Sequence, residues 1–275
     1  MSRRGFDGGG VNPAGHAETS DQSMKPADIT FVILTKNEEH NIAACLASLP
    51  SGAPALVYDA ESTDRTRMLA SDAGARVAVA PWRGVGIARD SAEQLVQTAW
   101  VFTLDADERV TPRLAAELDG LQTSDAIDAY SIPRANYFCG KWIRGAAWWP
   151  DRQVRMYRKG RARQTARDPR SRAAGHVFYV APGKTTDLDG HIIHHSYESV
   201  EDYRTRFKRY TDAEAGERPS TLVEFAKAWL VMPVRAVWLL VWRRGVLDGW
   251  RGVYVSVASA LYPAVVATKA LRARR

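Results

Sequence analysis

The stretch that decides the fold is ITFVILTKNEEHNIAACLASL, residues 29–49. Its first part, Ile29–Leu34, is apolar and rich in β-branched side chains, which predicts a buried strand. From Asn37 onward a helix is expected, because Asn37 is a good N-cap and apolar residues recur from Ile42 to Leu49 at helical spacing. A strand followed directly by a helix is the repeating unit of α/β proteins.

The same unit recurs along the first half of the chain. Three more short β-rich runs follow, at Ala55–Tyr58, Arg76–Val79 and Trp100–Leu104. Alternating strands and helices predict a doubly wound, mostly parallel sheet of the Rossmann-like kind, with ligands beyond the carboxyl ends of its strands. A second helix is expected to begin near Thr63-Asp64, to bury Met68 and Leu69 and to end at Gly74. Another is expected to begin at Thr111-Pro112, with Leu114, Leu118 and Leu121 on one face.

Polar clusters follow three of these strands. Asp105 and Asp107 come directly after the run Trp100–Leu104, and in an extended conformation they point to one face. Two carboxylates so placed can share Mg²⁺ or Mn²⁺ with the phosphates of a nucleoside diphosphate. The alternative is a solvated acidic turn before the helix at Thr111. The other clusters are Thr35-Lys36-Asn37-Glu38 and Asp59–Asp64, in which Asp59 is placed to bind a base or ribose and Asp64 either lines the pocket or caps a helix.

Charge is divided unevenly along the chain. Residues 1–133 carry 11 basic and 19 acidic side chains, and residues 134–275 carry 27 basic and 12 acidic ones. This predicts an acidic half that holds a cation and a basic half that meets phosphates, acidic glycans or a lipid surface. The two cysteines, Cys45 and Cys139, have no metal-ligand spacing and favour a reducing compartment.

Four motifs together resemble glycosyltransferase family 2. They are FVILTKNEEHNIAACLASL, VYDAESTDRT, GVGIARDSA and FTLDADERV, and the later IPRANYFCGKWIRGAAWWPDRQVRMYRKG and GVLDGWRGVYV resemble its lipopolysaccharide-core β-glucosyltransferase branch. The resemblance implies a GT-A fold and an inverting transfer from a nucleotide diphosphate sugar with a divalent metal. It places Thr35, Asn37 and Glu38 in the nucleotide pocket, Asp59 near the base, Arg89 near the base or diphosphate, and Asp105 and Asp107 on the metal.

The catalytic base is the main departure from this resemblance. That branch usually has a His-Glu pair where this chain has His176-Val177, and valine cannot accept a proton. Asp151 is the candidate substitute, since its aromatic surroundings are expected to raise its pKa. A lipid-phosphate acceptor would need no base, because its phosphate is already ionised. A metal cluster of His191, His194 and His195 is not expected, since alternation along a strand separates His194 from His195.

The C-terminal region predicts membrane association. Gly252–Thr268 is a stretch without charge, and it lies among tryptophans and arginines typical of an interfacial helical hairpin. A buried helical cap on the catalytic domain is the alternative. Nucleic-acid binding by the basic run Arg152–Arg172 is not expected, because no recognisable nucleic-acid module accompanies it.

These observations predict three regions: a disordered tail over 1–27, a GT-A domain over 28–218 and membrane-associated helices over 219–275. The expected protein is an enzyme at the cytoplasmic face of the inner membrane, bound peripherally to anionic lipid. It would transfer a sugar from a nucleotide sugar donor to a glycan, glycolipid or lipid-phosphate acceptor of the cell envelope. The alternatives are a polyprenyl-phosphate sugar transferase and a catalytically inactive membrane scaffold.

Overall fold

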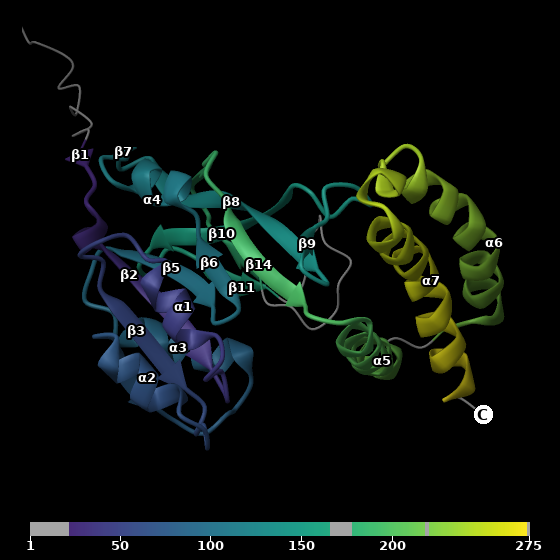
Figure 1. Cartoon of the computed structure of the whole chain (residues 1–275), viewed down its shortest axis with the longest axis horizontal. Helices are drawn as coiled ribbons and strands as arrows, with labels where there is room; N and C mark the ends of the chain where they lie inside the picture. Colours follow the sequence, from purple (N-terminus) through teal and green to yellow (C-terminus); the bar gives the residue numbers. More distant parts are fainter. Residues whose placement is uncertain (1–21, 166–177, 218–219, 274–275) are drawn as a thin grey trace, which may run out of the picture.

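A ten-stranded sheet forms the centre of the protein in a computed structural model that describes residues 22–165, 178–217 and 220–273 (Figure 1). The main path through the sheet runs β4-β3-β2-β5-β10-β8-β14-β6, and β9 and β13 pair with β8. Its strands are β2 (Ile29–Thr35), β3 (Ala55–Asp59), β4 (Arg76–Val79), β5 (Trp100–Asp105), β6 (Glu108–Val110), β8 (Ile127–Phe138), β9 (Lys141–Trp142), β10 (Asp151–Arg158), β13 (Lys184–Asp187) and β14 (Ile192–Tyr197).

Helices cover both faces of the sheet. The helices are η1 (Pro26–Asp28), α1 (Ile42–Ala47), α2 (Thr66–Asp72), α3 (Val85–Gln94), α4 (Pro112–Leu118), α5 (Val200–Glu217), α6 (Leu222–Leu240), η2 (Gly245–Asp248) and α7 (Trp250–Arg272). Residues of α1, α2 and α4 pack into one hydrophobic cluster, and residues of α3 pack into another. Two small sheets, β1 (Gln22–Ser23) with β7 (Gln122–Thr123) and β11 (Arg163–Thr165) with β12 (Phe178–Val180), complete the strands.

The predicted fold class is confirmed. Strands β4, β3, β2 and β5 lie parallel, as expected from the alternation of strands and helices, and all four predicted strands are present. Phe31 of β2 stacks on Phe102 of β5 with ring centroids 4.6 Å apart, and both rings are fully buried. Strand β10 then pairs antiparallel with both β5 and β8, so the second half of the chain extends the same sheet.

Two details of the predicted helices are wrong. The first helix begins at Ile42 and not at Asn37, which has a φ of 56°. This left-handed conformation is one that asparagine tolerates, and it lets the Asn37 N–H donate to the Ser62 hydroxyl at 2.8 Å. Met68 is 51% exposed, because the short helix α2 turns Thr66 and Ala70 inward instead. The expected start of α4 at Thr111 is confirmed by its hydroxyl, which accepts from the Leu114 N–H.

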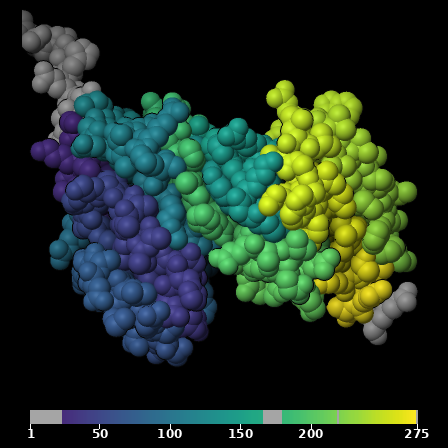
Figure 2. All heavy atoms as spheres, viewed as in Figure 1, coloured from purple at the N-terminus to yellow at the C-terminus, as the bar shows by residue number. Residues whose placement is uncertain are grey.

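The C-terminal helices form a lobe beside the sheet (Figures 1 and 2). Helices α6 and α7 pack against each other, and α5 packs on α7. The corner between α6 and α7 is tied to the sheet by Asp248, whose carboxylate accepts from the N–H groups of Arg144 and Gly145 at 3.0 and 2.7 Å. In the described part of the chain α7 alone is long and apolar enough to span a bilayer, by length and composition.

Substituting Gly252 with alanine is expected to destabilise the protein by about 1–3 kcal/mol through overpacking. A Cβ at position 252 would lie 2.0 Å from the backbone oxygen of Gly245, so η2 and α7 would have to separate. Thermal unfolding measures the effect. Gly216→Ala is the matched control in helix α5, where a Cβ meets nothing within 4 Å, and it is expected to be neutral or stabilising. Equal unfolding temperatures for both variants would contradict the described packing.

Candidate functional site

The loops after β2 and β3 are joined by side chains predicted to line a nucleotide pocket. Asp59 is fully buried, and its carboxylate accepts from the hydroxyls of Thr35 and Ser62 and from the Ser62 N–H. Its hydrogen-bonding capacity is therefore largely used inside the protein. In this arrangement Asp59 and Thr35 shape the loop after β3, and neither presents a free side chain to a base.

Asn37, Glu38 and Asp64 continue this cross-linking nearer the surface. Asn37 accepts from the Thr63 N–H through its side chain at 2.9 Å. One oxygen of Asp64 accepts from the Thr66 N–H, and the other accepts from the Glu39 N–H. Asp64 thus acts as a local cap that also joins the two loops. Burial raises the pKa of the Glu38 carboxyl, and the negative charge of Asp107 adds to the effect.

Asp105, at the end of β5, lies between two arginines. Its carboxylate is 3.3 Å from Nη2 of Arg89 and 3.4 Å from Nη2 of Arg155. Burial opposes ionisation of Asp105, but the two guanidiniums outweigh it and hold its pKa well below the usual range. Arg89 is only 10% exposed and lies over the ring of Tyr179, so it is not a surface charge of helix α3.

Asp105 and Asp107 do not lie on one extended strand. Strand β5 ends at Asp105, and Ala106 and Asp107 form a turn before β6 begins at Glu108. The expectation that alternation aligns the two carboxylates is therefore wrong. The turn instead separates their partners: Asp105 meets arginines, and Asp107 meets a histidine. No group of three or more histidine, cysteine, aspartate or glutamate side chains with metal-binding geometry occurs in the part of the chain that is described.

A chain of hydrogen bonds orients His194 toward Asp107. Nδ2 of Asn136 donates to Asp151 at 3.2 Å, so its Oδ1 faces Nδ1 of His194 at 2.7 Å. Because Oδ1 can only accept, this network assigns the proton of a neutral His194 ring to Nδ1. The lone pair of Nε2 then lies 3.4 Å from the Asp107 carboxylate. Two acceptors face each other here, so the arrangement suits a cation between them.

Glu108 is the central buried carboxylate of the site. Its side chain is fully buried, 2.6 Å from Nη2 of Arg155 and 3.3 Å from Nη1 of Arg134. Its second oxygen accepts from the Asp105 N–H at 3.0 Å. Glu108 therefore holds two arginines of β8 and β10 against the end of β5.

Asp151 does not have the expected raised pKa. Burial acts in that direction, but the guanidinium of Arg134, with hydrogen bonds from Arg134, Asn136 and Gln153, lowers the pKa of Asp151 below its usual value. Nε and Nη2 of Arg134 contact one carboxylate oxygen at 2.9 and 2.7 Å. The prediction that aromatic neighbours raise this pKa is thus wrong, because the Arg134 guanidinium contacts the carboxylate directly and stabilises its charge. The His176-Val177 position lies outside the described residues.

The other two histidines of this region have separate surroundings. His195 packs on the ring of Tyr137 with centroids 5.6 Å apart, and its N–H donates to the backbone oxygen of Asp107. His191 stacks on Trp142 and meets Trp149 edge to face. The alternation along β14 that separates His194 from His195 is present, and it directs His194 to the acidic turn.

Sequence reasoning missed Arg134, Asn136 and Arg155, and gave no role to His194 or Glu108. A usable signal existed for two of them, because Arg134 and Asn136 are polar residues two apart in an otherwise buried strand and so share one face. Arg155 stands in an arginine-rich run where nothing local distinguishes it from its neighbours. Only the pairing of β10 with β5 and β8 brings it to the acidic cluster.

Comparison with known families gives a match to the model described as glycosyl transferase family 2, over residues 30–179. Among curated proteins, the chain is 35% identical over 103 residues to an uncharacterized glycosyltransferase of Rickettsia bellii, which covers 37% of this chain and 35% of that protein. It is 40% identical over 95 residues to an uncharacterized glycosyltransferase of Mycobacterium tuberculosis, covering 33% of this chain and 44% of the relative. The chain thus spans less than half the length of these relatives.

Comparison with solved structures supports the fold over nearly the whole chain. A mannosyltransferase from Pyrobaculum calidifontis, solved in complex with GDP-Man and Mn²⁺, superposes with a TM-score of 0.51. The superposition covers 94% of this chain and 92% of the mannosyltransferase, at 14% sequence identity. The fold is therefore that of GT-A enzymes, including strands and helices beyond the region of the family match.

Replacing Glu108 with alanine is expected to cost about 3–5 kcal/mol of unfolding free energy, because it leaves two buried guanidiniums without their shared partner. Chemical denaturation followed by circular dichroism measures this loss. Asp189→Ala removes one partner of the exposed Arg113–Asp189 ion pair, 3.3 Å apart, and is expected to change stability by less than about 1 kcal/mol. A Glu108→Ala protein as stable as the Asp189→Ala protein would contradict the described network.

Proposed function

The chain belongs to glycosyl transferase family 2, and from this premise we propose that it transfers a sugar from a nucleotide diphosphate sugar to a cell-envelope acceptor. The proposed transfer inverts the anomeric carbon, and the acceptor is a glycan or glycolipid of the lipopolysaccharide-core kind. The observation that carries the proposal is the facing pair of Asp107 and His194, beside the arginine-bound Asp105 at the carboxyl end of a parallel sheet. Ligands of such sheets bind at this edge.

The cross-linked loops after β2 and β3 support a nucleotide pocket. Both loops follow parallel strands at the same edge of the sheet as Asp105, so they form one wall of the same region. Asp59 and Thr35 fix their shape, and Asn37, Glu38 and Asp64 lie nearer the surface, where a nucleotide can reach them. Arg89, held beside Asp105, brings a cation to the end of the sheet where a diphosphate would lie.

The residues present fit a divalent metal ion. The Asp107 carboxylate and the Nε2 lone pair of His194 are oxygen and nitrogen ligands that face each other, and Asn136 orients the imidazole from behind as second-shell groups do. A bound Mg²⁺ or Mn²⁺ would offset the charge that develops on the leaving diphosphate. The solved mannosyltransferase with the same fold contains Mn²⁺ and GDP-Man, which supports this assignment.

A lipid-phosphate acceptor is the second candidate function, and the state of Asp151 favours it. Inverting transfer to a sugar hydroxyl calls for a base near the working pH. Asp151 is bound by Arg134 and has a lowered pKa, so it is a weak base. A phosphate oxygen is already ionised and needs no proton removed. We therefore retain a polyprenyl-phosphate type of acceptor beside the glycan acceptor.

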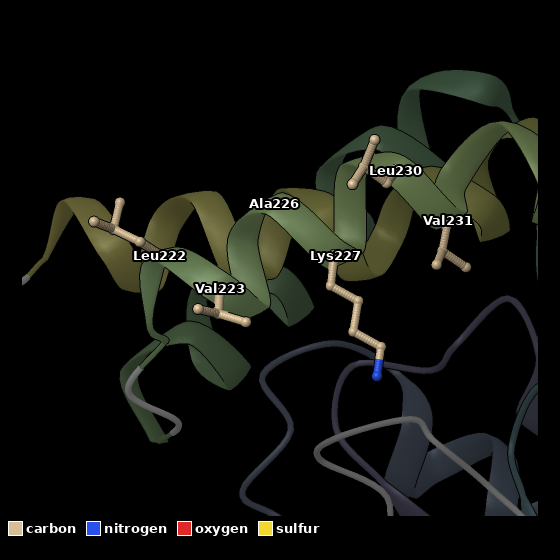
Figure 3. A pocket seen from close by; sticks show the side chains of 6 residues that line it. All are labelled: Leu222, Val223, Ala226, Lys227, Leu230 and Val231. Carbon is tan, nitrogen blue, oxygen red and sulfur yellow. The ribbon is translucent and has the colours of Figure 1, made fainter.

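We also propose that the C-terminal helices bind the cytoplasmic face of the inner membrane. Large apolar side chains of α6 are exposed, including Leu230 at 75% and Val234 at 70%. A shallow open hollow of the same helix is lined by Leu222, Val223, Ala226, Lys227, Leu230 and Val231 (Figure 3). Exposed tryptophans and arginines continue this surface at the α6–α7 corner, where Trp242 is 72% exposed. Such a surface is typical of a monotopic anchor that meets anionic lipid.

Asp107→Ala and His194→Ala are each expected to weaken Mn²⁺-dependent binding of a nucleoside diphosphate at least tenfold. Each is expected to lower the turnover of the nucleotide-sugar donor by a larger factor than it lowers binding. The physical reason is the loss of one ligand from a two-residue metal site. Isothermal titration with UDP and GDP, with and without Mn²⁺, measures binding, and hydrolysis of a panel of nucleotide sugars measures turnover. His40→Ala is the control, because the His40 side chain is 88% exposed.

Two outcomes separate the classes of function. An intact protein that binds no nucleoside diphosphate with or without Mn²⁺ would overturn the transferase proposal. Binding without turnover on any nucleotide sugar or acceptor would instead favour the catalytically inactive scaffold. Turnover that survives both substitutions would contradict the assignment of Asp107 and His194 to a metal site and would leave the transferase proposal standing.

The double substitution Leu230→Asp with Val234→Asp is expected to weaken binding to vesicles containing anionic phospholipid at least tenfold. It places two charges on the apolar face of α6 that would enter the headgroup boundary. Co-sedimentation measures binding. Met68→Asp with Ile87→Asp is the control, since these residues are 51% and 54% exposed on helices α2 and α3. Equal vesicle binding by the two double variants would show that α6 is not the membrane-contacting surface.

A further inference from the structure

A second pocket lies between the sheet and the corner of the C-terminal helices. It has a volume of about 1030 Å³ and is contained within the described residues. In Figure 1 the corner joining α6 to α7 lies beside the teal segment around β9. The pocket is lined by Tyr137, Lys141, Trp142, Arg144, Gly145, Ala147, Trp149, Pro150, Trp242, Arg243, Arg244, Leu247 and Asp248.

The walls of this pocket are held together by backbone contacts. The Ala146 N–H donates to the backbone oxygen of Arg243 at 2.8 Å. A Cβ at Gly145 would lie 2.5 Å from the backbone oxygen of Arg244, so only glycine permits this approach. The Asp248 carboxylate accepts from two backbone N–H groups at the same place. The pocket is thus a built junction between two parts of the chain.

The pocket is strongly cationic. Lys141, Arg144, Arg243 and Arg244 are all exposed, and none forms an ion pair within the part of the chain that is described. The single carboxylate of the pocket, Asp248, is buried and already bound to backbone donors. Four positive side chains around one occupied carboxylate leave a net attraction for an anion.

Aromatic rings and an apolar rim accompany these charges. The guanidinium of Arg144 lies over the Trp142 ring, 4.4 Å from its centroid, and Trp149 packs edge to face on Trp142. At the outer side Trp242 and Leu247 are 72% and 73% exposed, and they continue the apolar surface of α6. One side of the pocket is therefore suited to a charged headgroup, and the other is suited to an acyl or prenyl chain.

The pocket also reaches the candidate active site. Trp149 and Pro150 are followed directly by Asp151, which shares Asn136 with His194. Tyr137 packs on His195, whose N–H is bonded to the backbone of Asp107. Residues that line the pocket therefore contact, or directly adjoin in sequence, residues that bond to Asp107 and His194.

We propose that this pocket binds the phosphate-bearing headgroup of a lipid acceptor, with the lipid chain leaving past Trp242 and Leu247 toward the membrane. The inference rests on the proposed transferase function and adds to it the chemical class of the acceptor and the residues that recognise it. Arginine binds phosphate oxygens with paired, directional N–H donors, which gives Arg144 and Arg243 the leading roles. The apolar rim distinguishes this site from one for a free anion.

Monomeric dihexanoyl phosphatidic acid tests the proposal with the full-length protein, because at concentrations below aggregation it offers the headgroup without a bilayer. Tryptophan fluorescence and isothermal titration measure its binding. We expect it to bind at least tenfold more tightly than dihexanoyl phosphatidylcholine or inorganic phosphate. Arg144→Ala and Arg243→Ala are each expected to weaken binding roughly tenfold through lost charged hydrogen bonds. Arg161→Ala, which removes an exposed arginine of the turn after β10, is the matched control and is expected to bind normally.

Several outcomes would overturn the proposal. If the Arg144→Ala/Arg243→Ala double variant binds phosphatidic acid with wild-type affinity, these two arginines do not recognise the headgroup. If the protein binds phosphatidylcholine equally well, the pocket does not require a terminal phosphate. Equal affinity for inorganic phosphate assigns the pocket to a free anion, and displacement by a short single-stranded RNA assigns it to nucleic acid. Binding of UDP or GDP with Mn²⁺, measured on the same samples, separates the pocket proposal from the transferase proposal. If the protein binds the nucleotide but does not bind phosphatidic acid, the pocket proposal fails and the transferase proposal stands. If the intact protein binds neither nucleotide, the transferase proposal is overturned, and the proposed role of the pocket is overturned with it.

Discussion

The site depends on the buried contact between Glu108 and the arginines of β8 and β10. Glu108 is fully buried, and Arg155 and Arg134 approach one of its oxygens at 2.6 and 3.3 Å. Removing charges from water is costly, so such a cluster is stable only when each member has its partners. Asp105 also contacts Nη2 of Arg155, and Asp151 contacts Nη2 of Arg134, so the positions of these two carboxylates depend on the same arginines. The acidic turn after β5 is thereby held rigid at the edge of the sheet.

The uneven distribution of charge along the chain has a structural explanation in this contact. The carboxylates of the acidic turn come from the acidic first half, and Arg134, Arg155 and His194 come from the basic second half. The sheet brings the halves together, because β10 pairs with both β5 and β8. The opposite charges then largely neutralise each other inside the protein. The facing pair of Asp107 and His194 is where we propose that a further cation binds.

The C-terminal helices are part of the same arrangement through the pocket at their corner. Asp248 and Gly145 join the corner to the loop that leads into Asp151, so the C-terminal helices are held against the part of the chain that carries Asp151. Under the proposed function, an amphiphilic acceptor would meet the exposed apolar side chains of α6, then arginines, then the site. The proposed acceptor site would give the exposed apolar surface and the exposed arginines of the pocket one common role.

The sequence by itself determined the fold class, the four parallel strands and the acidic motif after β5, because these depend on local hydrophobic periodicity and on residue types within a few positions. The tertiary structure alone decided which residues complete the site. Arg155 and His194 lie far from Asp105 and Asp107 along the chain, and they reach them through the pairing of β10 with β5 and of β14 with β6. The shift in the pKa of Asp151 could not be predicted from the sequence either, because its direction depends on Arg134 on the neighbouring strand. A local sequence pattern determines a helix or a strand, whereas the register between paired strands determines which residues meet in a buried charge network.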